Sequence, residues 1–214
     1  MPKSATEALC FNLSQCIHAT AQPLAVLRAS LGNRRVEQMG VEELRELALS
    51  SSVEVERLCS HFSCLQQLVS TESTKPQLAE TSIQPLLEHV ADGVDLLYKE
   101  DRICLRSTVA GDCQPVLIDK ARTLKALSTI LLIAHAVSRP QDTVELIASS
   151  SSSNAVRVVV QNLTSCVDTM NAETSLSMAF AEANIRSQQA GFCWSLKPFS
   201  VQIDFEGVPL VSYR

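Results

Sequence analysis

Cys16-Ile17-His18-Ala19-Thr20-Ala21-Gln22-Pro23-Leu24 is the stretch around which the first part of the chain is organised. It lies in a segment whose apolar or small residues recur in steps of three and four, the repeat that lines one side of a helix. These residues are Leu9, Leu13, Cys16, Thr20, Leu24, Leu27 and Leu31. His18 falls off this stripe, so we expect the helix to present its imidazole to a partner. Pro23 predicts a kink or local loosening just after the histidine.

A second face of the same helix carries His18. Its other members are polar or small, with one aromatic near the start. They are Phe11, Gln15, Gln22, Ala25 and Ala29. We expect this helix to run from about residue 4 to residue 31, because Gly32-Asn33 is a strong stop signal. A face of this kind leaves room for a partner to approach His18 closely.

A second long helix is expected from about residue 41 to residue 70, after a turn region at 34–40. Its apolar residues alternate steps of four and three, the heptad repeat of a bundle or coiled coil. They are Leu44, Ala48, Ser51, Val55, Leu58, Phe62, Leu65 and Val69. One helical hairpin cannot hide two apolar stripes, whereas two copies can do so in a four-helix bundle. The sequence therefore predicts a homodimer formed through residues of roughly 4 to 70.

Composition narrows the class of protein. The 214 residues allow one large domain or two small ones, and the net charge of −5 argues against nucleic acid as a main partner. No apolar run approaches the roughly 18 residues that span a bilayer, and the N-terminus lacks a secretory signal, so we expect a cytoplasmic protein without a membrane segment. The eight cysteines form no Cys-x-x-Cys pair. We expect them to be small buried hydrophobes rather than metal ligands or disulfides.

The second half alternates helices and strands after a polar segment at 71–76. We therefore expect a helical hairpin domain at 1–74 and a second domain at 75–214. Helices are expected at 83–98, from Asp119 as N-cap to about 136, and at 171–190. Strands are expected at 103–109, 115–118, 143–148, 155–161, 192–196 and 199–205, with the serine run at 149–154 as a hairpin loop. The predicted fold class is α+β, a sandwich with helices on one side of a mixed sheet.

The spacing of His18, Pro23 and Leu24 resembles the phosphoacceptor box of sensor histidine kinases, His-Glu-Leu-Arg-Thr-Pro-Leu. Ala19 departs from it, because the family carries there an acidic residue that assists autophosphorylation. Val55-Glu56-Arg57-Leu58 is similar to a stretch of the second helix of the kinase dimerisation domain. The order of elements after residue 75 resembles the kinase ATP-binding domain. The resemblance covers nearly the whole chain and implies a dimeric phosphoacceptor hairpin followed by an ATPase-like domain.

The positions that such a domain uses for ATP are replaced. Ile133 stands where the resemblance places the magnesium-binding asparagine, and Asn162 where it places the aspartate that reads adenine. The stretches 162–167 and 175–178 contain no glycine, although phosphate loops need it so that backbone N–H groups can come close. The segment between the two stretches is too short for an ATP lid. We therefore expect neither ATP binding nor autophosphorylation.

The chain then resembles the ATP-less histidine phosphotransferases of bacterial two-component systems, which relay phosphoryl groups between response-regulator aspartates. The resemblance makes His18 the residue that carries the phosphoryl group, since a neutral imidazole nitrogen can attack an aspartyl phosphate. The receiver domain would bring the Mg²⁺, so no cofactor is expected on this chain. Gln22, one helical turn after His18, stands where kinases that also act as phosphatases carry a residue that orients water.

Docking of the receiver is expected on Gln15, Ala25, Arg28 and Ala29, although a solvated helix face would explain the same residues. Of the other histidines, His61 is expected to be a packing or surface residue, and His89 and His135 are expected to be structural. Two alternatives remain open. One is a pseudokinase scaffold that binds a response regulator without transferring phosphate. The other is an enzyme with an unrecognised nucleotide or ligand site in the second domain.

Overall fold

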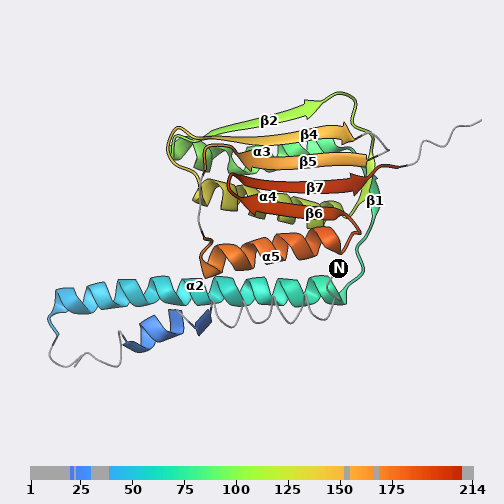
Figure 1. The fold of residues 1–214 in the computed structure, drawn as a ribbon. Helices are drawn as coiled ribbons and strands as arrows, with labels where there is room; N and C mark the ends of the chain where they lie inside the picture. Colours follow the sequence, from blue (N-terminus) through green and yellow to red (C-terminus); the bar gives the residue numbers. More distant parts are fainter. Residues whose placement is uncertain (1–19, 22, 30–38, 152–154, 166–168, 209–214) are drawn as a thin grey trace, which may run out of the picture. The chain divides into compact units, whose positions relative to one another are not determined.

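The structure, a computed structural model, describes residues 20–21, 23–29, 39–151, 155–165 and 169–208 (Figure 1). The chain divides into two compact units. The first comprises Met1–Val69 with Asn171–Leu176, and the second comprises Ser70–Met170 with Ser177–Arg214. The domain limits predicted from the sequence, residues 1–74 and 75–214, stay a prediction. Within the described ranges, no helix combines the length and the apolarity needed to cross a membrane.

The long helix of the first unit is α2, Val41–Ser73. Glu42 and Glu43 lie in its first turn, where the partial positive charge of a helix N-terminus favours carboxylates. The Glu43 carboxylate accepts a hydrogen bond from the backbone N–H of Gly40 at 3.2 Å, which satisfies a donor that the helix leaves open. The helix begins where the sequence predicted. It ends three residues later than residue 70, because the predicted linker contains no helix breaker before Pro76.

One side of α2 is buried along a seam that repeats every seven residues. Leu47, His61 and Leu68 are buried, and Glu54 between them is partly buried. Ser51, Leu58 and Leu65 are also partly buried and complete the steps of four and three. The predicted stripe shares Ser51, Leu58 and Leu65 with this seam. Its remaining members are exposed in this chain: Leu44, Ala48, Val55, Phe62 and Val69. The polar members of the seam, a glutamate and a histidine, hid it from a search for apolar periodicity.

The second unit is an α+β sandwich, as predicted. Its helices are α3 (Ile83–Glu100), α4 (Lys120–Ala136) and most of α5 (Ala172–Arg186). The five-stranded sheet has the order β2-β4-β5-β7-β6, with strands Cys104–Ala110, Thr143–Ser151, Ala155–Asn162, Phe199–Glu206 and Gly191–Leu196 in that order. β2 pairs with β4 in parallel, and the other neighbours pair antiparallel, so the sheet is mixed. A separate antiparallel pair joins β1 (Ala79–Thr81) to β3 (Val116–Ile118).

The core of the second unit lies between the helices and one face of the sheet (Figure 1). Side chains along the central strands alternate between buried and half-buried, as expected when one face is covered. The buried members on these strands are Val144, Leu146, Ala148, Val156, Val158, Val160, Val201, Ile203 and Phe205. Helices α3, α4 and α5 all contribute to the same core, for example through Leu87, Leu127 and Ile185. The predicted arrangement of helices on one side of a mixed sheet is confirmed.

Several predicted limits are wrong in detail. β4 continues through Ser151, because Ser149 pairs with Ala110 of β2 on one side and with Arg157 of β5 on the other. Backbone hydrogen bonds on both sides hold serines in a strand that their side chains do not favour. α5 ends at Arg186 rather than at residue 190. The strand β1 was missed because three residues carry no readable period.

The expectation that the cysteines are buried is also wrong for the five that lie within the described residues. Cys59, Cys104 and Cys193 are exposed, and Cys64 and Cys113 are only half-buried. Cys104 opens β2 and Cys193 lies on β6, and both strands are edges of the sheet. Side chains at alternate positions of an edge strand remain open to solvent, which apolar neighbours in the sequence do not reveal.

Candidate functional site

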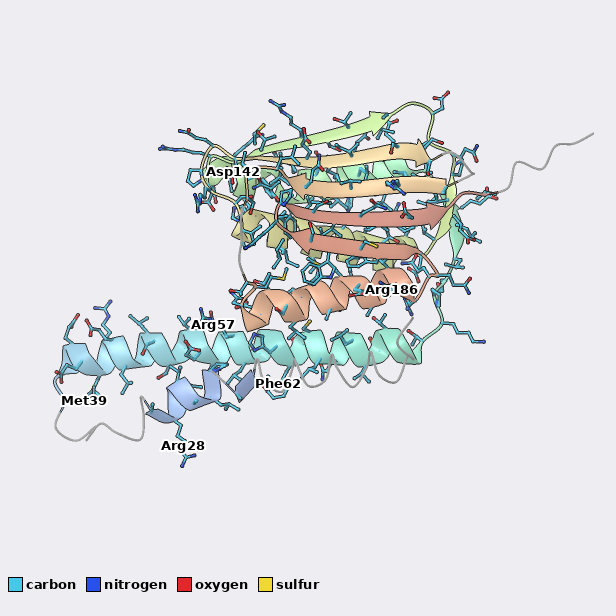
Figure 2. The ribbon with its side chains drawn as sticks, in the orientation of Figure 1. Arg28, Met39, Arg57, Phe62, Asp142 and Arg186 are labelled. Atoms are coloured by element: carbon cyan, nitrogen blue, oxygen red, sulfur yellow. The ribbon has the colours of Figure 1, made fainter. Side chains whose placement is uncertain are left out.

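The predicted phosphoacceptor face lies only partly within the described residues. His18, Gln15 and Gln22 fall outside them, so their roles stay a prediction. Residues 23–29 are helical, as predicted, and Ala25, Arg28 and Ala29 are all exposed on this helix. Figure 2 shows Arg28 projecting from it. In the described part of the predicted docking face, the methyl groups of the two alanines and the guanidinium of Arg28 are therefore exposed to solvent.

The same helix buries a different side. Pro23 is buried and Leu27 is half-buried, whereas Leu24 is 52% exposed. The predicted apolar stripe therefore leaves one large side chain uncovered in the single chain. On α2, Phe62 is similarly uncovered, with 56% of its surface exposed (Figure 2). Exposed large apolar side chains that recur along a helix are typical of a surface that a partner covers.

The position where the resemblance places the adenine-reading aspartate is closed. Asn162, the last residue of β5, is fully buried. Its amide nitrogen donates to Ser138 Oγ at 2.7 Å and to Asp142 Oδ2 at 3.0 Å. Its amide oxygen accepts from the backbone N–H groups of Thr164 and Ser165, both at 3.0 Å. The side chain uses both of its N–H donors and its oxygen inside the protein, so none is left to read a base.

Asp142 is the acidic partner of this network. Its carboxylate accepts from the Arg139 backbone N–H at 2.9 Å and from Thr164 Oγ1 at 2.8 Å, besides the bond from Asn162. Desolvation by burial works to raise the pKa of this carboxyl. The hydrogen bonds from Arg139, Asn162 and Thr164, and then the charge of Arg139, outweigh it and hold the pKa below its usual value. The charged form of Asp142 is therefore the one that the surroundings favour.

The position of the magnesium-binding asparagine is also closed. Ile133 on α4 is 4% exposed and belongs to the hydrophobic core of the second unit. An aliphatic side chain offers Mg²⁺ no oxygen ligand. Among the described residues, no group of three or more His, Cys, Asp or Glu side chains is placed to hold a metal ion.

A second polar cluster, which sequence reasoning missed, surrounds Arg122 on α4. Its guanidinium donates from Nη1 to the Thr71 carbonyl at 3.1 Å and to Ser187 Oγ at 2.9 Å. Nη2 donates to the Thr74 carbonyl at 2.8 Å and to Thr74 Oγ1 at 2.7 Å. Nε lies 3.5 Å from the Asp119 carboxylate. Arg122 thus satisfies carbonyls at the end of α2, which has no basic residue of its own in its last turn.

Asp119 makes three further hydrogen bonds in this cluster. It caps α4, as predicted, by accepting from the Arg122 backbone N–H at 3.1 Å. Its other oxygen accepts from the Gln77 backbone N–H at 2.9 Å, and its own N–H donates to Gln188 Oε1 at 2.6 Å. The Asp-x-x-Arg spacing of residues 119 and 122 was the only local signal of this cluster, because its other members come from distant segments.

His135 takes a structural place, as expected. Its ring packs edge-on against Tyr98, with centroids 5.2 Å apart, and its Nε2 lies 2.9 Å from Asp101 Oδ2. The Tyr98 hydroxyl donates to the Leu131 carbonyl at 2.7 Å, and burial raises its pKa. The expectation that His89 is structural is wrong, because it lies off the buried side of α3 and is exposed. His61 is 5% exposed and lies in the seam of α2.

Comparison with known proteins now adds to this geometry. No protein-family model matches the sequence, and no curated protein matches it either. The fold, in contrast, is similar to that of the Acinetobacter baumannii histidine kinase AdeS. The TM-score is 0.66 at 14% identity, over 88% of this chain and 97% of that chain.

The fold of this chain is thus similar to that of a histidine kinase core. The catalytic domain of histidine kinase ThkA is also similar, over 60% of this chain and 94% of that chain, with a TM-score of 0.51 at 13% identity. ThkA in complex with the response regulator protein TrrA matches 90% of this chain and 59% of that chain, with a TM-score of 0.66 at 12% identity. At these identities the likeness concerns the fold. Within this fold, the side chains of Ile133 and Asn162 are both buried.

Proposed function

We propose that this protein is an ATP-less histidine phosphotransferase, which relays phosphoryl groups between receiver-domain aspartates of response regulators through His18. The observation that carries the proposal is that Asn162 is buried and fully hydrogen-bonded within a fold similar to that of histidine kinases. A histidine kinase needs that position free to read nucleotide, and here its donors and its oxygen are all used by the protein itself. Ile133, buried in the core, adds the loss of the magnesium ligand.

The chemistry asks for one exposed imidazole on a helix. A neutral ring nitrogen of His18 attacks the phosphorus of an aspartyl phosphate, the bond from phosphorus to the aspartate oxygen breaks, and the carboxylate leaves. The phosphoryl group then passes from the ring nitrogen to a second aspartate by the reverse step. Mg²⁺ bound by the receiver would neutralise the charge that is spread over the phosphoryl oxygens. Gln22 is proposed to orient water for hydrolysis of a receiver's aspartyl phosphate.

Open surface next to the proposed phosphoacceptor supports this function. Ala25 and Ala29 are exposed and small, and Arg28 brings a positive charge that can pair with acidic groups of a receiver. The ThkA structure contains a response regulator bound to a protein of the same fold, which makes a receiver domain the partner of choice. Gln15 is proposed to complete the docking face.

The same function requires assembly. We infer that two copies form a four-helix bundle in which the exposed apolar members of α2, Phe62 among them, are covered by the second copy. A dimer would hide these side chains, which the single chain leaves open to water.

The test is phosphotransfer from a panel of purified, radiolabelled phospho-receivers of the same organism. Wild-type protein should take up label that is stable to base and labile to acid, as phosphohistidine is, and His18→Ala should take up none. His89→Ala is the matched control, because His89 is exposed on the second unit and should leave transfer intact. Label that persists on His18→Ala would contradict the proposal. Receiver binding by both proteins without any transfer would favour a pseudokinase scaffold.

A further inference from the structure

Two connections of the second unit are joined by side chains rather than by backbone pairing. One connection runs from α4 to β4 and contributes Ser138 and Asp142, while the other leaves β5 and contributes Thr164. Asn162 lies between them and bonds to both. Ser165 strengthens the contact, since its hydroxyl donates to the Val137 carbonyl at 3.1 Å.

The donor and acceptor roles of Asn162 and Asp142 in their shared hydrogen bond are fixed by their chemistry. The Asn162 amide nitrogen can only donate, and the Asp142 carboxylate can only accept when it is charged. Thr164 Oγ1 lies 2.8 Å from Asp142 Oδ1 and 2.8 Å from Asn162 Oδ1, and its single proton can serve either oxygen. Because the Asn162 side chain is fully buried, a partner removed here would leave a polar group without water to replace it.

We propose that Ser138, Asp142, Asn162 and Thr164 form a latch that holds the two connections together without any ligand. The latch requires an amide at position 162 as long as position 142 is a carboxylate. This proposal rests on the proposed loss of nucleotide binding. It adds that the loss depends on two residues together, Asn162 and Asp142. Asn162 and Asp142 then act as a matched pair, and restoring an aspartate at position 162 alone does not reopen a nucleotide site.

The physical reason is charge. An aspartate at position 162 would set one carboxylate within about 3 Å of another at Asp142, in a place where Asn162 now donates at 3.0 Å. Two carboxylates so close cannot both stay ionised without a large cost. Asp142→Asn removes this conflict, because an asparagine at that position can turn its NH₂ toward the new carboxylate.

The experiment uses the full chain and three variants, Asn162→Asp, Asp142→Asn and the double variant, measured by thermal unfolding and by hydrogen exchange. The backbone amides of Thr164 and Ser165 report on the latch, since both donate to Asn162. In Asn162→Asp they should exchange at least about tenfold faster, and the double variant should recover most of that protection. Gln141→Glu, which adds the same charge at an exposed neighbouring position, should leave their exchange unchanged.

Nucleotide titration with Mg·ATP completes the test. Neither Asn162→Asp nor the double variant should bind it at millimolar concentration. The latch is overturned if Asn162→Asp leaves unfolding and exchange as in the wild type, if the double variant is no better protected than Asn162→Asp, or if Asn162→Asp gains nucleotide binding. If Asn162→Asp fails to fold, recovery of folded protein by the added Asp142→Asn decides the question. Phosphotransfer through His18 should persist in every folded variant, so failure of the latch and failure of the proposed function give different results.

Discussion

The helical face at residues 25–29 and the polar cluster around Asn162 differ in how much of each remains available to a partner. The first presents two alanines and an arginine to solvent. The second is built around Asn162, which is fully buried and uses its side-chain donors and its oxygen within the protein. The proposed function assigns docking of a receiver domain to the first region, and the resemblance assigns reading of adenine to the position of Asn162. The comparison indicates that one of them is open for a partner and the other has become part of the structure.

The largest expected effect concerns the open region. Phe62→Asp should convert the proposed dimer to a monomer, because a charge buried without a partner at the interface costs several kcal/mol. Multi-angle light scattering at micromolar concentration measures the change. Ser63→Asp carries the same charge at the next exposed position, off the apolar stripe, and should leave the dimer intact. A wild-type protein that is already a monomer would refute the proposed assembly.

The next effect concerns the polar interior. Arg122→Ala should lower the free energy of unfolding by about 3 kcal/mol, because it removes the charge that pairs with the Asp119 carboxylate and leaves the carbonyls of Thr71 and Thr74 without this donor. Urea unfolding followed by circular dichroism measures this difference. Lys120→Ala, at an exposed position on the same helix, should change stability by less than about 0.5 kcal/mol. If both variants lost a similar amount of unfolding free energy, the polar contacts of Arg122 would not be the cause of its effect.

A smaller effect is expected in the seam of α2. Both ring nitrogens of His61 are buried and have no hydrogen-bond partner among the described residues. His61→Leu should therefore stabilise the protein by about 1 kcal/mol, since the substitution replaces unsatisfied polar atoms by apolar ones. The midpoint of urea unfolding reports the change, with His89→Leu as the exposed control. A clear loss of stability in His61→Leu would mean that the imidazole makes a stabilising bond.

The smallest expected effects are changes in the pKa values of two carboxyl groups, Asp142 and Asp204. Desolvation works to raise the pKa of Asp204 as it does that of Asp142, but hydrogen bonds from Arg157 and Gln202 and the charge of Arg157 lower it. Arg157→Leu should therefore raise the pKa of Asp204 toward about 3.9 and leave that of Asp142 in place. Carbon-detected NMR titration of both carboxyls checks this. Equal shifts of both carboxyls would contradict these assignments.

The sign of the pH dependence follows from the same directions. A carboxyl whose pKa is lower in the folded protein than in the unfolded chain stabilises the fold above the unfolded value, near 3.9. That contribution is lost as the pH falls through the folded value. Asp142 and Asp204 both belong to this class. Their part of the stability should therefore be constant from pH 7 to about pH 5 and should decline below about pH 4.

Much of the fold could be read from local patterns. Alternation along β4, β5 and β7 predicted the strands, and Asp119 marked the start of α4, because these signals depend on neighbouring residues. The buried seam of α2 was missed because Glu54 and His61 occupy positions where apolar side chains are expected.

The polar clusters could not be read in this way. Arg122 bonds to Thr71 across 51 residues, and Asn162 bonds to Asp142 across 20. Such pairs leave no period in the sequence, since they arise only when distant connections meet in the folded unit. For the candidate site, the sequence could identify which family residues are replaced. It could not say whether the replacements leave an open cavity or a closed cluster, which depends on these long-range bonds.

One measurement tests the central claim most directly, the source of the phosphoryl group on His18. Purified protein is incubated with Mg²⁺ and either radiolabelled ATP or a radiolabelled phospho-receiver, and the acid-labile label on the wild type is compared with that on His18→Ala. The account predicts label from the phospho-receiver alone, present on the wild type and absent from His18→Ala. Label from ATP on the wild type would contradict it, because a protein whose Asn162 is closed to adenine and whose Ile133 cannot hold Mg²⁺ has no means of using that donor.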